Sequence, residues 1–331
     1  MPRFAAARTS LAALAGLGLM LTACSPQPEA STASTEASAG INVVASTNVY
    51  GDIAKWIGGD KVSVTAIINK TSQDPHSYEA TAQDRLAVSK ADLVIENGGG
   101  YDDFLHALAE DSSLDAGNVL NAVELSGLAH PEEEASGEAT PAESAAADDH
   151  AHDHGELNEH VWYSLAAMGQ LADGVAAKLG ELEPASASTF ESNAAAFKSG
   201  LEELGGKLEG LKAGAAGAQV AVTEPVPVYL LEAAGLENAT PEDYTAAIEE
   251  GSDVPPAVLK AATDLVSSKS VRFLAYNGQT EGPQTEALKK AAEAAGVPVV
   301  DFSETLPEGK TYVQWMTDNV NNVSKVLEKN S

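Results

Sequence analysis

Short apolar stretches alternate with longer stretches of helical spacing along the first part of the chain. Several of the apolar stretches are hydrophobic on both faces, which is typical of a parallel sheet covered by helices on both sides. The apolar stretches at 41–46, 62–68, 92–97 and 118–125 predict strands, and 49–57, 81–91 and 101–110 predict helices.

The same alternation returns in the last third of the chain, after a long helical middle. Residues 162–182 and 184–212 have helical spacing without strand signals. We therefore predict an α/β fold of two Rossmann-like lobes with mainly parallel sheets, a lobe over 41–183 and a lobe over 213–331, joined by a long helix over 184–212. The predicted strands here are 219–223, 272–277 and 297–302, and the predicted helices are 228–234, 255–268, 283–295 and 312–328.

The amino terminus has the pattern of an export signal. A start with two arginines and no acid precedes the apolar run LAALAGLGLML, and small residues follow it. The ending Leu-Thr-Ala-Cys resembles a bacterial lipobox, which implies a signal peptide over 1–23 and a lipid on Cys24; the alternative is an inert thiol. Residues 24–40 are rich in Ser, Thr, Ala, Pro and Glu, and predict a flexible tether.

The net charge and the cysteine content exclude several kinds of partner and of metal site. The formal net charge is −30, which argues against nucleic acid and anionic membrane surfaces as partners. The one cysteine excludes an intramolecular disulfide and a metal site made only of cysteines. No apolar run reaches the roughly 20 residues that a membrane-spanning helix needs.

An acidic insertion interrupts the first lobe at 126–156. It contains the run His150, Ala151, His152, Asp153, His154. Histidines alternating with acids in a solvated loop favour weak collection of metal ions; the alternative is a run of solvated polar residues.

Metal-ligating residue types follow the predicted strands. His76, His160 and Glu224 lie after strands or at their ends, and Asp301 and Glu304 lie at the last strand. Ligands form sites beyond the carboxyl ends of parallel strands, so facing lobes would bring these side chains together. Two imidazoles and two carboxylates suit a divalent first-row metal ion, although each residue taken singly also fits a surface or core position. His106 and His130 are expected at the surface.

Four stretches resemble the metal-binding lipoproteins of bacterial ABC importers for zinc and manganese, the cluster A-I proteins. They are DPHSYEAT (74–81), NEHVWYSL (158–165), VTEPVPVYLLEAAGL (222–236) and VVDFSETLP (299–307). The resemblance implies a rigid linking helix and a lipid-anchored extracytoplasmic protein that captures Zn²⁺ or Mn²⁺ and delivers it to a membrane permease. It implies His76, His160, Glu224 and Glu304 as ligands, with Asp301 as the alternative to Glu304.

The identity of the metal stays open at this point. A carboxylate at Glu224, where many zinc members have histidine, favours manganese, whereas the histidine run at 150–154 favours zinc, and we lean to zinc. We expect a monomer without enzymatic activity.

Three other functions are possible for a sequence of this composition. An organic-solute-binding protein would need aromatic platforms and arginine clamps, and the body has only Arg85 and Arg272. A metallohydrolase needs an open coordination position and a base, for which Glu79 and Glu159 are the candidates. A surface adhesin has no residue that specifically supports it.

Overall fold

The structure, a computed structural model, describes residues 40–73, 75–128 and 157–329. The predicted signal peptide, the tether up to residue 39 and most of the acidic insertion lie outside these ranges. The described residues form two sheets of parallel strands with helices around them, so the predicted α/β fold class is confirmed.

The first sheet has the strand order β2-β1-β3-β4, with every pair parallel. Its central strand β1 pairs through Val43 with Val64 on one side and with Leu93 on the other. The order places β1 between β2 and β3, which requires crossover connections through helices. The strands are β1 (Ile41–Thr47), β2 (Val62–Ile68), β3 (Leu93–Glu96) and β4 (Val119–Asn121); the helices are α1 (Asn48–Gly58), α2 (Ala82–Val88), α3 (Asp103–Glu110) and α4 (Ala122–Ser126).

The second sheet repeats this arrangement with the order β6-β5-β7-β8, again with parallel pairs. The central strand β5 lies between β6 and β7, as β1 does in the first sheet. The strands are β5 (Ala218–Val222), β6 (Leu236–Asn238), β7 (Leu274–Asn277) and β8 (Val299–Phe302); the helices are α7 (Val228–Ala233), α8 (Glu242–Glu249), α9 (Pro256–Ser267) and α10 (Pro283–Ala295).

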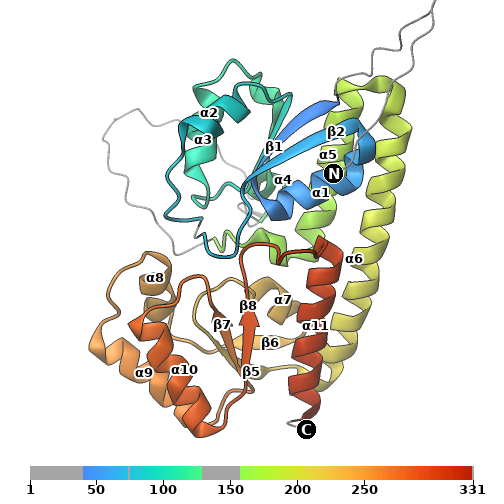
Figure 1. Cartoon of the computed structure of the whole chain (residues 1–331). Helices are drawn as coiled ribbons and strands as arrows, with labels where there is room; N and C mark the ends of the chain where they lie inside the picture. Colours follow the sequence, from blue (N-terminus) through green and yellow to red (C-terminus); the bar gives the residue numbers. More distant parts are fainter. Residues whose placement is uncertain (1–39, 74, 129–156, 330–331) are drawn as a thin grey trace, which may run out of the picture. The chain divides into compact units, whose positions relative to one another are not determined.

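Two long helices, α5 (Leu165–Leu182) and α6 (Ala187–Ala215), connect the sheets, and a third long helix, α11 (Tyr312–Lys329), follows β8. Helix α6 packs against α5 and α1 of the first lobe and against α7 and α11 of the second, and Figure 1 shows it running beside both. Its buried residues Phe197 and Leu204 join one continuous hydrophobic core with Val43 of β1 and Val222 of β5. The two sheets therefore share a core.

Two parts of the sequence-based prediction were wrong. The predicted strand 118–125 ends at Asn121, because the Asn121 side chain accepts the backbone N–H of Glu124 at 3.0 Å and begins α4. The sequence analysis also assigned no element between 236 and 254, where β6 and α8 lie. Each is short, and two of the three β6 residues are exposed, so neither gives a clear hydrophobic period.

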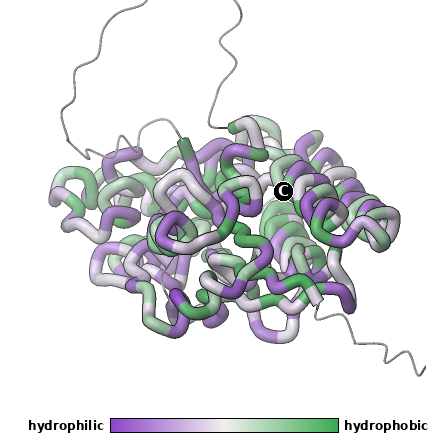
Figure 2. The backbone as a smooth tube through the Cα atoms, turned by 90° about the horizontal axis from the view of Figure 1, so that it is seen from above, coloured by the Kyte–Doolittle hydropathy of each residue, from purple (hydrophilic) through white to green (hydrophobic). Residues whose placement is uncertain are grey.

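Hydrophobic and hydrophilic stretches alternate along the coiled parts of the chain in Figure 2, as expected for helices with one buried face. Within the described ranges, no helix has both the length and the apolar character needed to cross a bilayer.

Candidate metal centre

The carboxyl ends of the strands in the two lobes lie next to each other. Asn48, directly after β1, donates to the Leu306 carbonyl and accepts the Leu306 N–H, both at 2.8 Å, and Leu306 lies just after β8. The Tyr163 hydroxyl donates to the Ser303 carbonyl at 2.8 Å. Side chains that follow strands in either lobe can therefore meet between them.

Two of the predicted ligands come from the first lobe. His76 lies in the loop after β2 and its side chain is 18% exposed, whereas His160 is 1% exposed. The centroids of the two imidazole rings are 5.9 Å apart. This spacing leaves room for an ion bound by a nitrogen of each ring.

Glu224 and Glu304 come from the second lobe and are held by one amide. Asn277, the last residue of β7, donates through Nδ2 to Glu224 Oε2 at 2.6 Å and to Glu304 Oε1 at 2.7 Å. Glu304 Oε2 lies 3.8 Å from His76 Nε2 and accepts the Tyr101 hydroxyl at 3.1 Å. All four predicted ligands are thus brought to one place, and both carboxylates are about 98% or more buried.

Tyr101 reaches Glu304 because a glycine turn follows β3. Gly98 has φ +79°, and a Cβ there would lie 2.2 Å from the Asn121 amide, so only glycine fits. Asp102 closes the turn by accepting the backbone N–H groups of Asn97 and Gly98 at 2.6 and 2.9 Å.

The His160 ring is oriented by Asn158. The Oδ1 of this amide accepts the His160 backbone N–H at 3.0 Å and lies 2.8 Å from Nδ1, and its Nδ2 donates to the Pro225 carbonyl at 3.0 Å. Because an amide oxygen only accepts, Nδ1 carries the proton and Nε2 keeps a lone pair for a metal ion. Burial lowers the pKa of His160 to about 4, so the ring is neutral at pH 7, as a ligand must be.

The sequence analysis missed two acidic residues at this place. One ligand atom each from His76, Glu159, His160 and Glu249 lies within 4.8 Å of the others. Burial, and then the charge of Glu159, raises the pKa of Glu249 to about 9. The sequence indicates Glu159 only as a candidate base for hydrolysis, and Glu249 lies in the segment without a predicted element.

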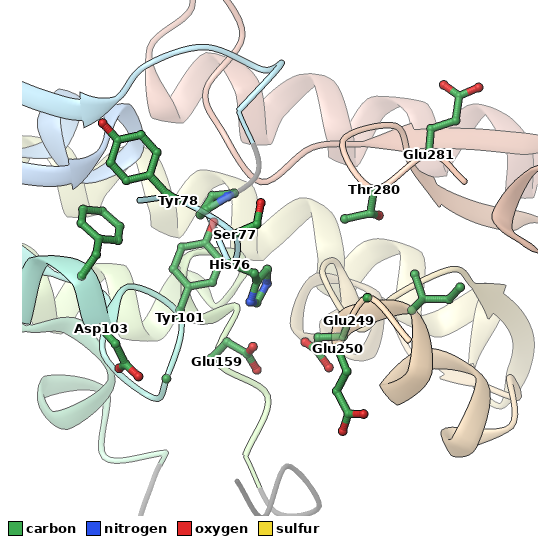
Figure 3. Close-up of a pocket in the computed structure, with 15 residues that line it drawn as sticks. His76, Ser77, Tyr78, Tyr101, Asp103, Glu159, Glu249, Glu250, Thr280 and Glu281 are labelled. Carbon is green, nitrogen blue, oxygen red and sulfur yellow. The ribbon is translucent and has the colours of Figure 1, made fainter. Parts of the chain in front are cut away.

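A cavity of about 630 Å³ opens onto the site (Figure 3). Its lining includes His76, Glu159, Glu249, Glu250 and Glu281. The carboxylate of Glu281 points away from His76 in Figure 3. The cavity has a strongly acidic wall, which attracts cations and repels anions.

Other predicted residues lie elsewhere. Asp301 and Glu79 are exposed. The His106 side chain is 57% exposed, as expected, and its Nδ1 lies 3.2 Å from the buried Glu96 carboxylate. Cys24, His130, His150, His152 and His154 lie outside the described residues.

Comparisons with known proteins agree with this architecture. The "Manganese ABC transporter substrate-binding lipoprotein scaA" of Streptococcus gordonii is 25% identical over 93% of this chain and 95% of that protein. The "Manganese-binding lipoprotein MntA" of Halalkalibacterium halodurans is 29% identical over 52% of this chain and 50% of that protein.

Solved structures share the fold. The periplasmic zinc binding protein TroA from Treponema pallidum matches with a TM-score of 0.66 and 20% identity, covering 87% of this chain and 99% of that one. The binding protein FpvC from Pseudomonas aeruginosa in complex with Mn²⁺ matches with a TM-score of 0.67 and 22% identity, covering 88% and 100%. The family profile of ZnuA, "Zinc-uptake complex component A periplasmic", matches residues 43–326. The chain therefore belongs to this family of zinc-uptake components.

Proposed function

We propose that this chain is the extracytoplasmic metal-binding component of an ABC importer. It captures Zn²⁺ or Mn²⁺ between its two lobes through His76, His160, Glu224 and Glu304, and delivers the ion to a membrane permease. The observation that carries the proposal is the convergence of these side chains, with one Asn277 amide bonded to both carboxylates and Glu304 lying 3.8 Å from His76.

The chemistry of the ligands supports a divalent cation. Two neutral imidazoles and two carboxylates balance the charge of the ion, which lowers the cost of burying it. Imidazole favours zinc and other first-row metals over Mg²⁺ and Ca²⁺, and carboxylate accommodates manganese as well. The zinc name of the family and the manganese names of the curated relatives agree with this mixed donor set.

We propose no catalytic role. Four protein ligands close a metal site, whereas metal-assisted hydrolysis needs a coordination position for water.

We further propose that a lipid on Cys24 anchors the protein and that residues 25–40 tether it. The lipoprotein names of the curated relatives support this reading. Metabolic labelling with palmitate should label the wild type and not Cys24→Ala. Absence of label from the wild type would contradict the anchor.

Metal analysis tests the central proposal. We expect one Zn²⁺ or Mn²⁺ per wild-type chain after removal of metal by chelation and reloading, and no stable loading with Mg²⁺. His76→Ala and Glu304→Gln should each weaken binding by at least about tenfold, because each removes one ligand.

His106→Ala is the matched control, because it removes an imidazole that lies outside the site. It should leave metal content and affinity unchanged. Equal metal binding by the wild type, His76→Ala and Glu304→Gln would rule out this site.

A further inference from the structure

We propose that Glu159 and Glu249, together with His76 and His160, form a second, outer binding position for the same divalent cation. The ion occupies it on the way in, and then exchanges these two carboxylates for Glu224 and Glu304 while the imidazoles hold it. This inference rests on the proposed function and adds a route by which the buried ligands are loaded and unloaded.

The geometry separates the four carboxylates into two pairs around the imidazoles. Glu159 and Glu249 line the cavity, together with His76. Glu224 and Glu304 are 2% and 1% exposed and are not among the residues that line it, whereas Glu159 is 5% exposed and the Glu249 side chain 13%. An ion that arrives through the cavity therefore meets the outer pair first.

The outer pair can reach the same imidazoles. One ligand atom from each of His76, Glu159, His160 and Glu249 lies within 4.8 Å of the others. Tetrahedral ligands of a bound zinc ion are about 3.4 Å apart, so these side chains would have to move closer by up to about 1.4 Å to hold the ion together. The Oε1 of Glu249 lies 3.8 Å from His160 Nδ1, which places this carboxylate beside the ring, although the nitrogen left for a metal ion is Nε2. Figure 3 shows the carboxylates of Glu159 and Glu249 near the His76 ring, each coming from a different lobe.

The surroundings of Glu249 raise the free energy of an ionised carboxylate unless a cation binds beside it. Its Oε1 is buried and has no hydrogen-bond partner. It is the last residue of α8, at the helix end where the dipole disfavours negative charge. Among the described residues, the imidazole of His160 is the one basic group within 4.0 Å of this carboxylate, and it is neutral at pH 7. A cation bound here would supply a partner for this buried oxygen.

Rapid-mixing kinetics with Zn²⁺ alone test the outer position. Fluorescence of Trp162 can report binding, because its ring centroid lies 5.1 Å from that of His160. Glu249→Gln and, separately, Glu159→Gln should slow both association and dissociation by about tenfold, which corresponds to about 1.4 kcal/mol in the barrier. The equilibrium affinity should change less than about threefold, because a step on the route affects both directions equally.

Glu250→Gln is the control. It makes the same substitution one residue further on, in an exposed side chain that lines the same cavity. The comparison is made in about 1 M salt, where long-range attraction is screened beyond about 3 Å. Under these conditions Glu250→Gln should bind and release Zn²⁺ at the wild-type rates.

Two outcomes would overturn the inference. Rates in Glu249→Gln and Glu159→Gln equal to those of Glu250→Gln would mean that the outer pair does not bind the ion. A loss of affinity in these variants as large as in Glu304→Gln would mean that they ligate the final ion. Absence of Zn²⁺ and Mn²⁺ binding by the wild type would instead reject the proposed function itself.

Discussion

Asn158 is the residue that orients the ring of His160, a proposed metal ligand. Its amide fixes the ring through Oδ1 and reaches the second lobe through Nδ2, which a carboxylate at this position could not do. Asn158→Leu should weaken Zn²⁺ binding by about 10- to 100-fold, as expected when the group that orients a ligand is removed.

Asn158→Asp keeps the acceptor for Nδ1 and is the matched comparison. It should retain most of the affinity that Asn158→Leu loses, measured by competition with a chromogenic chelator. Equal losses in the two variants would show that the Nδ1 contact does not matter.

Asp102 should make stability depend on pH. Burial raises its pKa from the ordinary 3.8 to about 6, against the lowering effect of the backbone N–H of Asn97. The folded state therefore binds more protons than the unfolded state between these values, and the free energy of unfolding falls as pH rises from about 4 to about 6. The contribution is at most about 3 kcal/mol.

Urea unfolding of the metal-free protein at pH 4.5 and 7 checks this, with Asp102→Asn as the comparison. The change with pH should be smaller in Asp102→Asn. Parallel pH profiles for the two proteins would contradict the assignment to Asp102.

Much of the candidate site could be predicted from single residues, and the rest depends on their surroundings. His76, His160, Glu224 and Glu304 stand out because ligand types follow predicted strands. Asn277 could not be recognised, since an amide at a strand end gains its role only when two carboxylates converge on it. As ligands, the four residues stay a prediction.

At the scale of elements, the long helix α6 has a well-packed face and also glycines where an added Cβ would meet no other atom. Gly205 and Gly206 are helical, and a Cβ added to either would meet no atom within 4 Å. Gly205→Ala and Gly206→Ala should each raise the free energy of unfolding by about 0.5–1 kcal/mol, because alanine has less backbone freedom to lose.

Gly98→Ala should have the opposite sign in the same urea measurement. Its φ of +79° and the nearby Asn121 amide disfavour a Cβ, so we expect a loss of more than about 1 kcal/mol. Destabilisation by Gly205→Ala would show that α6 needs its glycines.

Helices and strands with a clear period were predictable to within a few residues at each end. The strand expected at 62–68 is β2 as the structure has it, and the helix expected at 283–295 is α10. The failures share a physical cause: β4, β6 and α8 are short, and tertiary contacts rather than a long hydrophobic period define them. Because α8 was missed, Glu249 was missed with it.

At the scale of the whole described molecule, direct hydrogen bonds join the two lobes. The Tyr312 hydroxyl donates to the Trp162 carbonyl at 2.6 Å, and Tyr101 donates to Glu304 across the site. A ligand shifts the equilibrium between two conformations only if it binds them with different affinities. The hydrogen bonds between the lobes disfavour a wide hinge motion. Release to a permease therefore requires local opening around the ligands.

Helix α6 and both sheets contribute to one hydrophobic core, and this shared core determines how the protein unfolds on heating. Val43 of β1, Phe197 of α6, and Val222 and Phe302 of the second sheet belong to one packed cluster, so neither lobe can lose its order without exposing the interior of the other. Calorimetry of residues 40–331 should show a single cooperative transition with equal calorimetric and van't Hoff enthalpies, and bound metal should raise its midpoint without splitting it.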